Sequence, residues 1–306
     1  MKTTLITGAY GFLGRHTASL FKKHGFRVIG MGHGHWGFEH PGDFGIDQWF
    51  EADIDFSSLV KIEENLDCII HCAGGSSVGY SMQYPLRDFH RTVTASVNLL
   101  EYIRLQQPGA RLIYPSSAAV YGAKDDKPLK ENEALNPVSP YGFHKKIVEE
   151  LCSSYVANFG LSVAIIRFFS VYGAGLEKQL LWDACNKLSQ AKEKKQVIFF
   201  GTGDETRDWI HVEDSAELIY HMSQAKENFE IINGASGKKK DIKQILSQLA
   251  SFFNNSTCID FNRQFKEGDP KYYWADISLA KQKGWQPKMD MDNGISDYVD
   301  WFKTQK

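Results

Sequence analysis

Hydrophobic residues in the first half of the chain change repeatedly between short continuous runs and a helical spacing. The runs predict buried strands over residues 2–7, 27–31, 67–73, 111–116 and 161–168. Between them, apolar residues three and four positions apart predict helices over residues 12–24, 85–106 and 140–158. Strands that alternate with helices indicate an α/β fold whose parallel sheet is covered on both faces.

The pattern becomes mixed after residue 170. Short strands are expected over residues 197–200, 207–210, 229–232 and 258–261, and helices over residues 177–194, 212–226, 241–254 and 293–303. We therefore expect a first domain over residues 1–170 and a smaller mixed α/β domain over residues 171–306, with part of the chain returning to the first. Segment 30–47 has many glycines and no periodicity, which predicts a loop.

Charge and composition exclude several classes of partner. The net charge is −2 and the pI is about 6.6, so no basic footprint for nucleic acid is present. No apolar stretch has the length of a membrane span, and the N-terminus lacks a signal-peptide pattern. The five cysteines have no paired-motif spacing, which indicates reduced thiols and a cytoplasmic location.

Three glycines spaced three apart lie between the first predicted strand and the first predicted helix, within residues 7–14 (TGAYGFLG). Gly8 allows the tight turn, Gly11 lets the backbone approach a pyrophosphate, and Gly14 lets the helix pack closely on the sheet. In this context the spacing is a dinucleotide-binding fingerprint, and it makes the first domain a Rossmann-type doubly wound sheet. The expected cofactor contacts in this turn are Gly8, Tyr10, Gly11, Phe12, Leu13 and Gly14.

The acidic residue that often follows the second strand and binds the ribose hydroxyls of NAD is missing. Gly32 takes that place and His33 follows it. Without a carboxylate there, and with Arg15 or a histidine available for a 2′-phosphate, the pattern favours NADP(H) and leaves NAD(H) open. Asp53, followed by Ile54, comes after the third strand; Asp53 is a candidate contact for adenine or, equally, a solvated loop residue.

Candidate chemistry lies at three positions. Tyr141 and Lys145 are four residues apart and share one face of the predicted helix. A nearby ammonium favours the phenolate form of tyrosine, which could then take a proton from a sugar hydroxyl or return one to a ketone. Ser117, at the end of a predicted strand, could hydrogen-bond the same oxygen.

Several motifs together resemble the extended short-chain dehydrogenase/reductases, in the nucleotide-sugar epimerase/dehydratase group that includes UDP-galactose 4-epimerase. The resemblance covers nearly the whole chain and is carried by residues 7–14, 71–74, 116–122, 141–145, 167–173, 201–214 and 268–276. It implies that Ser117, Tyr141 and Lys145 are catalytic and that Ala73 and Gly74 line the cofactor. It also implies substrate contacts from Ser76, Ser77, Ser117, Ser170, Arg207, Lys266 and Tyr273, and a homodimer in which helices 85–106 and 140–158 form a four-helix bundle.

The sequence departs from the family pattern in places. Ser170 and Thr92 stand where asparagine is frequent, and Lys266 stands where many members have arginine. Ala118 and Ala119 occupy the positions of the acidic pair of the 4,6-dehydratases, so elimination of water is not expected.

These observations favour NADPH-dependent reduction of a nucleotide-linked 4-keto sugar. A nucleotide-sugar 4-epimerase of the UDP-glucose/galactose type with bound NAD would use the same residues and is the alternative. A non-catalytic dinucleotide sensor is disfavoured because Tyr141 and Lys145 are both present. The histidines of segment 30–47 lack the spacing of a zinc site, so no metal is expected.

Overall fold

The structure is a computed structural model and describes residues 1–191, 196–253, 258–264 and 270–305. The chain forms two compact units. Unit 1 comprises residues 1–122, 131–168 and 215–234, and unit 2 comprises residues 123–130, 169–214 and 235–306. The predicted division into a cofactor domain (1–170) and a substrate domain (171–306) stays a prediction, because compactness does not identify what each unit binds.

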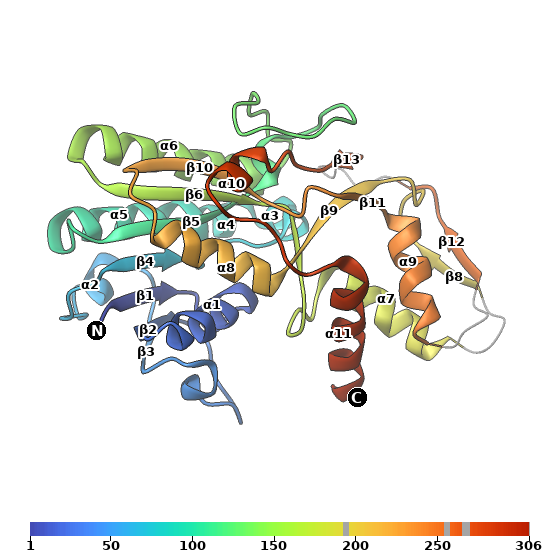
Figure 1. Ribbon diagram of the computed structural model, residues 1–306, viewed down its shortest axis with the longest axis horizontal. Coiled ribbons are helices and arrows are strands. Elements are labelled where there is room, and N and C mark those ends of the chain that lie inside the picture. Colours follow the sequence, from blue (N-terminus) through green and yellow to red (C-terminus); the bar gives the residue numbers. More distant parts are fainter. Residues whose placement is uncertain (192–195, 254–257, 265–269, 306) are drawn as a thin grey trace. The chain divides into compact units, whose positions relative to one another are not determined.

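Unit 1 is built on a seven-stranded parallel sheet, which confirms the predicted fold class (Figure 1). Its strands are β1 (Thr3–Thr7), β2 (Arg27–Gly32), β3 (Gln48–Glu51), β4 (Cys68–His71), β5 (Arg111–Ser117), β6 (Ser162–Phe168) and β10 (Phe229–Gly234). They lie in the order β10-β6-β5-β4-β1-β2-β3, so the order reverses between β1 and β4. Open sheets of this kind bind ligands outside the carboxyl ends of the strands at that reversal.

Helices cover both faces of this sheet. They are α1 (Phe12–Lys23), α2 (Phe56–Leu59), α3 (Val78–Gln83), α4 (Pro85–Phe89), α5 (Ala95–Gln106), α6 (Pro140–Phe159) and α8 (Val212–Ser223). A continuous core joins α5 and α6 to the strands, with Leu100, Val148 and Ile165 among its fully buried residues. Each such side chain contributes about 1.5–3 kcal/mol by leaving water, so this core holds α6 firmly against the sheet.

The helix predicted over residues 85–106 differs from the observed one. It begins at Pro85 and ends at Gln106, but its residues His90–Thr94 form a π-helical turn between α4 and α5. A π turn accommodates one extra residue and is common at functional sites. Here the hydroxyl of Thr92 accepts a hydrogen bond from the N–H of Gly75, 2.9 Å away, so the turn holds the loop that follows β4.

Segment 30–47 also differs in detail from the predicted loop. It begins inside β2, and Pro41–Phe44 form a short 3₁₀-helix capped by His40. Strand β3 is the strand expected before Asp53, for which the sequence pattern sets no bounds. Helices α2 and α3 were not predicted, because each is too short to show a clear period.

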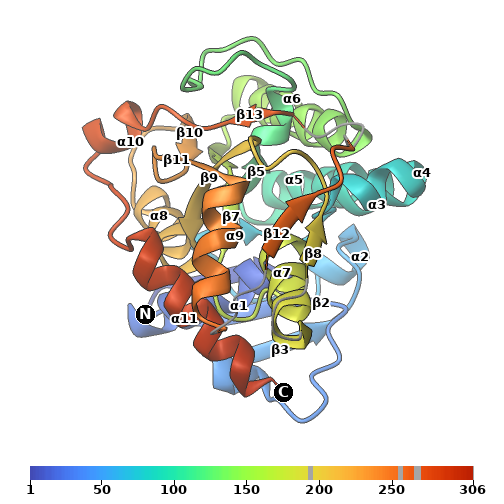
Figure 2. The same cartoon turned by 90° about the vertical axis from the view of Figure 1, so that its right-hand side faces the viewer.

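Unit 2 contains a four-stranded sheet of β7 (Ser170–Tyr172), β9 (Thr206–His211), β11 (Lys239–Asp241) and β13 (Tyr272–Tyr273), and a pair of β8 (Gln196–Phe199) and β12 (Cys258–Phe261). Its helices are α7 (Gln179–Gln190), α9 (Ile242–Ser251), α10 (Ser278–Gln282) and α11 (Met291–Thr304), and Figure 2 looks onto α7, α9 and α11. Parallel and antiparallel pairs both occur in this unit. Within the described residues, no helix is both long and apolar enough to cross a membrane.

Candidate active site

The glycine turn between β1 and α1 meets the loop after β4 at the carboxyl edge of the sheet. Gly8 has φ +68°, and a Cβ atom there would lie 2.6 Å from the backbone nitrogen of Ala73. A Cβ atom on Gly14 would lie 2.3 Å from the carbonyl oxygen of Gly8. Both glycines are therefore required by close backbone packing, as predicted from their spacing.

The N-terminus of α1 is open to an anion. Gly11 is its N-cap residue, so no side chain caps the helix, and the first turn contains no acidic residue. Tyr10 precedes this N-cap, and Phe12 and Leu13 form the first turn. Unpaired N–H groups and the helix dipole at this end fit the pyrophosphate of a dinucleotide.

A carboxylate does lie beside the end of β2, although none follows that strand in sequence. Asp53 Oδ1 lies 2.5 Å from Nε2 of His33, the residue that directly follows Gly32. The pairing of β2 with β3 brings Asp53 there, and the N–H of Ala52 donates to the carbonyl of Gly32 at 3.0 Å. Ile54, which follows, is buried. Strand pairing thus restores a negative charge that the order of residues along β2 lacks.

Arg15, predicted as a possible phosphate contact, is already engaged within the protein. Its guanidinium lies over the rings of Tyr10, Trp36 and Phe44, at 5.1, 5.7 and 4.4 Å from their centres. It also pairs with Glu39 Oε1 at 3.2 Å and donates from Nε to the carbonyl of Tyr10 at 3.1 Å. A cation with these contacts is a poor candidate for an additional phosphate.

The loop after β4 holds the next predicted residues. Ala73 lies against the glycine turn. Gly74 precedes Gly75, whose N–H donates to the hydroxyl of Thr92. Ser76 follows, and Ser77 is the N-cap residue of α3, where its hydroxyl accepts from the N–H of Tyr80. This loop therefore lies at the carboxyl end of a strand next to the reversal of strand order.

The structure brings Ser117, Tyr141 and Lys145 together. Ser117 ends β5, and its side chain hydrogen-bonds that of Tyr141 in the first turn of α6. Lys145 Nζ donates to the carbonyl of Pro115 at 2.8 Å and lies 6.0 Å from the centre of the Tyr141 ring. We refer to Ser117, Tyr141 and Lys145 as the trio.

Burial controls the charges of the trio. Burial lowers the pKa of Lys145 to about 8, against the opposing influence of Asp88 and Glu149. Burial also raises the pKa of Tyr141, which the hydrogen bond with Ser117 lowers and the charge of Asp88 raises. A bound positive charge near the phenol would favour the phenolate, as oxidised nicotinamide does when it is present.

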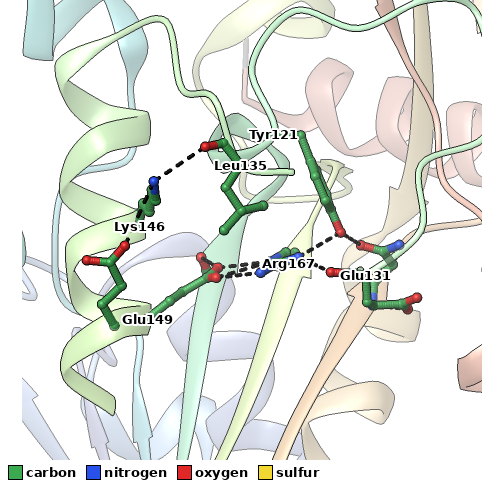
Figure 3. Close-up of polar contacts among 9 residues, drawn as sticks. Tyr121, Glu131, Leu135, Lys146, Glu149 and Arg167 are labelled. Atoms are coloured by element: carbon green, nitrogen blue, oxygen red, sulfur yellow. Dashed lines mark hydrogen bonds and ion pairs between the residues drawn. The ribbon is translucent and has the colours of Figure 1, made fainter. Parts of the chain in front are cut away.

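A buried ion pair that sequence reasoning missed joins the helix and strands of the trio (Figure 3). Glu149 Oε2 accepts from Arg167 Nη2 at 2.7 Å, and Glu149 Oε1 accepts from the hydroxyl of Ser116 at 2.6 Å. Arg167 Nη1 donates to Tyr121 Oη at 3.1 Å and to the carbonyl of Glu131 at 2.8 Å. Glu149 follows Lys145 by four residues, and this helical spacing was the one indication in the sequence.

Three predicted substrate residues of unit 2 lie on neighbouring strands. Tyr273 of β13 is opposite Arg207 of β9, and Ser170 of β7 is opposite Trp209 of the same strand. Arg207 Nη1 donates to the carbonyl of Thr206 at 2.8 Å. Lys266 lies outside the described residues.

Two histidines of the loop after β2 have partners within the protein. His33 pairs with Asp53, and His40 caps the 3₁₀-helix. In the described part of the chain, no group of three histidine, cysteine, aspartate or glutamate side chains is arranged to hold a metal ion.

A model of the NAD dependent epimerase/dehydratase family matches residues 4–234. The chain belongs to this family. The resemblance inferred from the motifs is thereby confirmed, and so is the class of enzyme: a short-chain dehydrogenase/reductase type that works with a nicotinamide dinucleotide.

Relatives within the family share the fold over the full length. The chain is 27% identical to a UDP-glucuronate 4-epimerase of Thermodesulfobacterium geofontis, over 98% of this chain and 95% of the relative. It is 25% identical to a UDP-N-acetylglucosamine 4-epimerase of Methanobrevibacter ruminantium solved with UDP-N-acetylmuramic acid, with a TM-score of 0.89 over 100% of this chain and 99% of the other. It is 26% identical to a UDP-glucuronic acid 4-epimerase of Bacillus cereus solved with UDP-glucuronic acid and NAD, with a TM-score of 0.88 over 99% and 100%.

We expect Glu149→Gln to lower the free energy of unfolding by about 3–5 kcal/mol, because it leaves the buried guanidinium of Arg167 without a counter-charge. Urea denaturation measures the change. Glu101→Gln is the matched control, because Glu101 pairs with Arg104 where both side chains are about one-third exposed; it should cost less than about 1 kcal/mol. Equal losses of unfolding free energy in the two variants would show that the buried pair contributes no more to stability than the exposed one.

Proposed function

We propose that this protein interconverts the C4 epimers of a nucleotide-linked hexose, a UDP-sugar, using bound NAD. The observation that carries this proposal is the assembled trio in a chain whose relatives above are UDP-sugar 4-epimerases. The sequence alone favoured a 4-keto-sugar reductase, but none of those relatives is named as one. Ala118 and Ala119, at the start of the turn after β5, offer no acid or base for dehydration.

In the proposed reaction, Tyr141 takes the proton of the C4 hydroxyl as hydride leaves C4. NAD, when bound, would supply the reversible hydride acceptor for C4. Ser117 holds the reacting oxygen, and the ammonium of Lys145 stabilises the phenolate. After the keto sugar turns over, Tyr141 returns the proton to the C4 oxygen. Because bound NAD would give back the hydride that it took, no net oxidation would occur.

The substrate contacts are proposed from the two units separately. Ser76 and Ser77 follow the cofactor loop of unit 1. In unit 2, Arg207 suits a diphosphate, because a guanidinium binds phosphate oxygens with two parallel donors. Ser170, Tyr273 and Lys266 complete this proposed set.

Charge at the end of β2 supports NAD rather than NADP. Asp53 lies beside His33 at the edge where a 2′-phosphate would be bound, and Arg15 is already paired with Glu39. A carboxylate repels the extra phosphate, and no uncommitted arginine of this turn compensates. The Bacillus cereus relative was solved with NAD.

A homodimer through α4, α5 and α6 is proposed as well. Leu86, Val97, Leu105, Phe143 and Phe159 on these helices are large apolar residues with 36–68% of their surface exposed. Exposed apolar residues gathered on neighbouring helices are typical of interfaces between subunits.

Tyr141→Phe should retain NAD and lose epimerisation by at least about 10²-fold, because it removes the acid/base oxygen and little else. Chromatography of UDP-hexose mixtures measures the interconversion. Tyr155→Phe, on the same helix with its hydroxyl on Glu101, is the control and should stay active. Stoichiometric consumption of NADPH by a nucleotide 4-keto sugar, without inversion of UDP-hexoses, would overturn the proposal in favour of reduction.

NAD should bind at least about 10-fold more tightly than NADP, since the proposed site places a carboxylate where the extra phosphate would bind. Calorimetric titration of the cofactor-free chain measures both affinities. Asp53→Asn should narrow the ratio several-fold, whereas Glu63→Gln, at an exposed position, should leave it unchanged. Tighter binding of NADP by the unaltered chain would refute this assignment.

The chain should have twice its mass of 34.7 kDa in solution. Leu86→Asp places a charge in the proposed interface and should shift the mass measured by light scattering toward one chain. Ile198→Asp is the control, because Ile198 on β8 is also a large apolar residue exposed to solvent, and it should leave the mass unchanged. A monomeric unaltered chain at micromolar concentration would contradict the proposed dimer.

A further inference from the structure

A second buried ion pair lies beside the trio and has no part in the mechanism above. Asp88 of α4 is fully buried, and its Oδ2 atom lies 2.6 Å from Nδ1 of His144 in α6. The His144 side chain is 11% exposed, and the ring of Phe89 packs against it edge-on at 5.4 Å. Because His144 directly precedes Lys145 and follows Tyr141 by three residues, the pair is attached to the same helical turns as the trio.

Asp88 is unusual because half of its carboxylate has no hydrogen-bond donor. Its Oδ1 atom is buried and has no partner. A Cβ atom on Gly75 would lie 2.0 Å from Oδ1, so this oxygen lies against the backbone of the loop after β4. Buried carboxylates are normally hydrogen-bonded at both oxygens. The negative charge of Asp88 is therefore only partly compensated by its own contacts.

The charge of Asp88 acts on the groups of the trio. It favours the ammonium of Lys145 and opposes the phenolate of Tyr141. The pKa of Tyr114 on β5 is raised mainly by burial, and Asp88 adds to this less than Cys152, Tyr141 and Glu149 do. The other groups around it, Gly75 on the loop and Thr92 on the π turn, are uncharged.

Glu149, the other carboxylate that acts on Lys145, differs in kind. It shares both oxygens with Arg167 and has a counter-charge at every pH at which the protein is folded. Asp88 has only the imidazole of His144 as a side-chain partner, through one of its two oxygens. Of the two carboxylates that act on Lys145, Asp88 is therefore the one whose charge its own contacts compensate least.

We propose that Asp88 and His144 are positioning residues for the proposed 4-epimerase: they hold a negative charge at a fixed place beside Tyr141 and Lys145, and so set the pH at which Tyr141 gives up its proton. The inference rests on the proposed function for its meaning in catalysis. His144 has a definite part in it, because its ring is the hydrogen-bond partner of Asp88 Oδ2. Without that partner neither oxygen of the buried carboxylate would have a hydrogen bond, and burial disfavours the charged form of a carboxyl group.

The test follows the ionisation of Tyr141 directly in the NAD-loaded protein, without sugar. Tyrosinate absorbance is recorded against pH, and the profile of the Tyr141→Phe variant is subtracted. Asp88→Asn should move the midpoint of Tyr141 to lower pH by about one unit, the size expected for one charge several ångströms away in a site of intermediate dielectric. The acidic limb of kcat/KM should move the same way.

Two variants of His144 separate charge from packing. His144→Ala should also lower the midpoint of Tyr141 ionisation. The double variant with Asp88→Asn should have the same midpoint as Asp88→Asn alone, because both changes remove the same negative charge. His144→Gln supplies another N–H donor and should restore the midpoint of the unaltered protein. Glu150→Gln, an exposed carboxylate on the same helix, is the control and should leave the midpoint in place.

A purely structural role predicts loss of stability in Asp88→Asn and His144→Ala with the Tyr141 midpoint unmoved. A shift of less than about 0.3 pH units in Asp88→Asn would therefore overturn the inference. If that variant does not fold, His144→Ala against His144→Gln decides the matter in the same way. Failure of the proposed function is separate, because it appears as absent epimerisation in the unaltered protein while the titration needs no substrate.

Discussion

The ion pair between Glu149 and Arg167 connects the three elements on which the candidate site depends. Ser117 lies at the end of β5, whereas Tyr141 and Lys145 lie in α6, so their geometry requires that strand and helix keep one fixed relation. Glu149 binds Ser116 on β5 and Arg167 on β6, and Lys145 binds the carbonyl of Pro115. Each contact is made by a side chain of α6 with a strand end, and together they prevent the helix from sliding along the sheet.

A buried ion pair of this kind fixes the position of α6 on the sheet more than it stabilises the fold. Taking two charges out of water costs several kcal/mol, which their attraction offsets only when the geometry is good. Apolar residues of the same volume would hold α6 to the sheet about as strongly, as the core of Leu100, Val148 and Ile165 already does. Apolar contacts tolerate small rotations, whereas the fork of Arg167 accepts Glu149 in one orientation. The direction in which Tyr141 points is thus determined by hydrogen bonds that Glu149 makes farther along the same helix.

The sequence predicted those parts of the site whose geometry is determined within one short segment of the chain. Gly8 and Gly14 are needed by local backbone packing, and Tyr141 and Lys145 share a helix face whatever surrounds them. Glu149 was missed because its partner Arg167 is distant in sequence, and only the pairing of β5 with β6 makes Ser116 and Arg167 neighbours. The π turn was missed for a related reason: the apolar spacing of residues 85–106 is helical throughout, and the hydrogen bond from Gly75 to Thr92 is tertiary.

The end of β2 shows why order along the chain is an incomplete guide where charge matters. By that order alone the absence of an acid after Gly32 favours a 2′-phosphate, since the rule concerns one position in one strand. A phosphate responds to charge in space, and β3 supplies Asp53 at the same edge. Arg15, a candidate cation for that phosphate, is paired with Glu39 from the glycine-rich segment 30–47. Carboxylates from neighbouring segments therefore reverse the sign that the local sequence suggests, and a cofactor preference is better argued from the paired strands than from the residue that ends one of them.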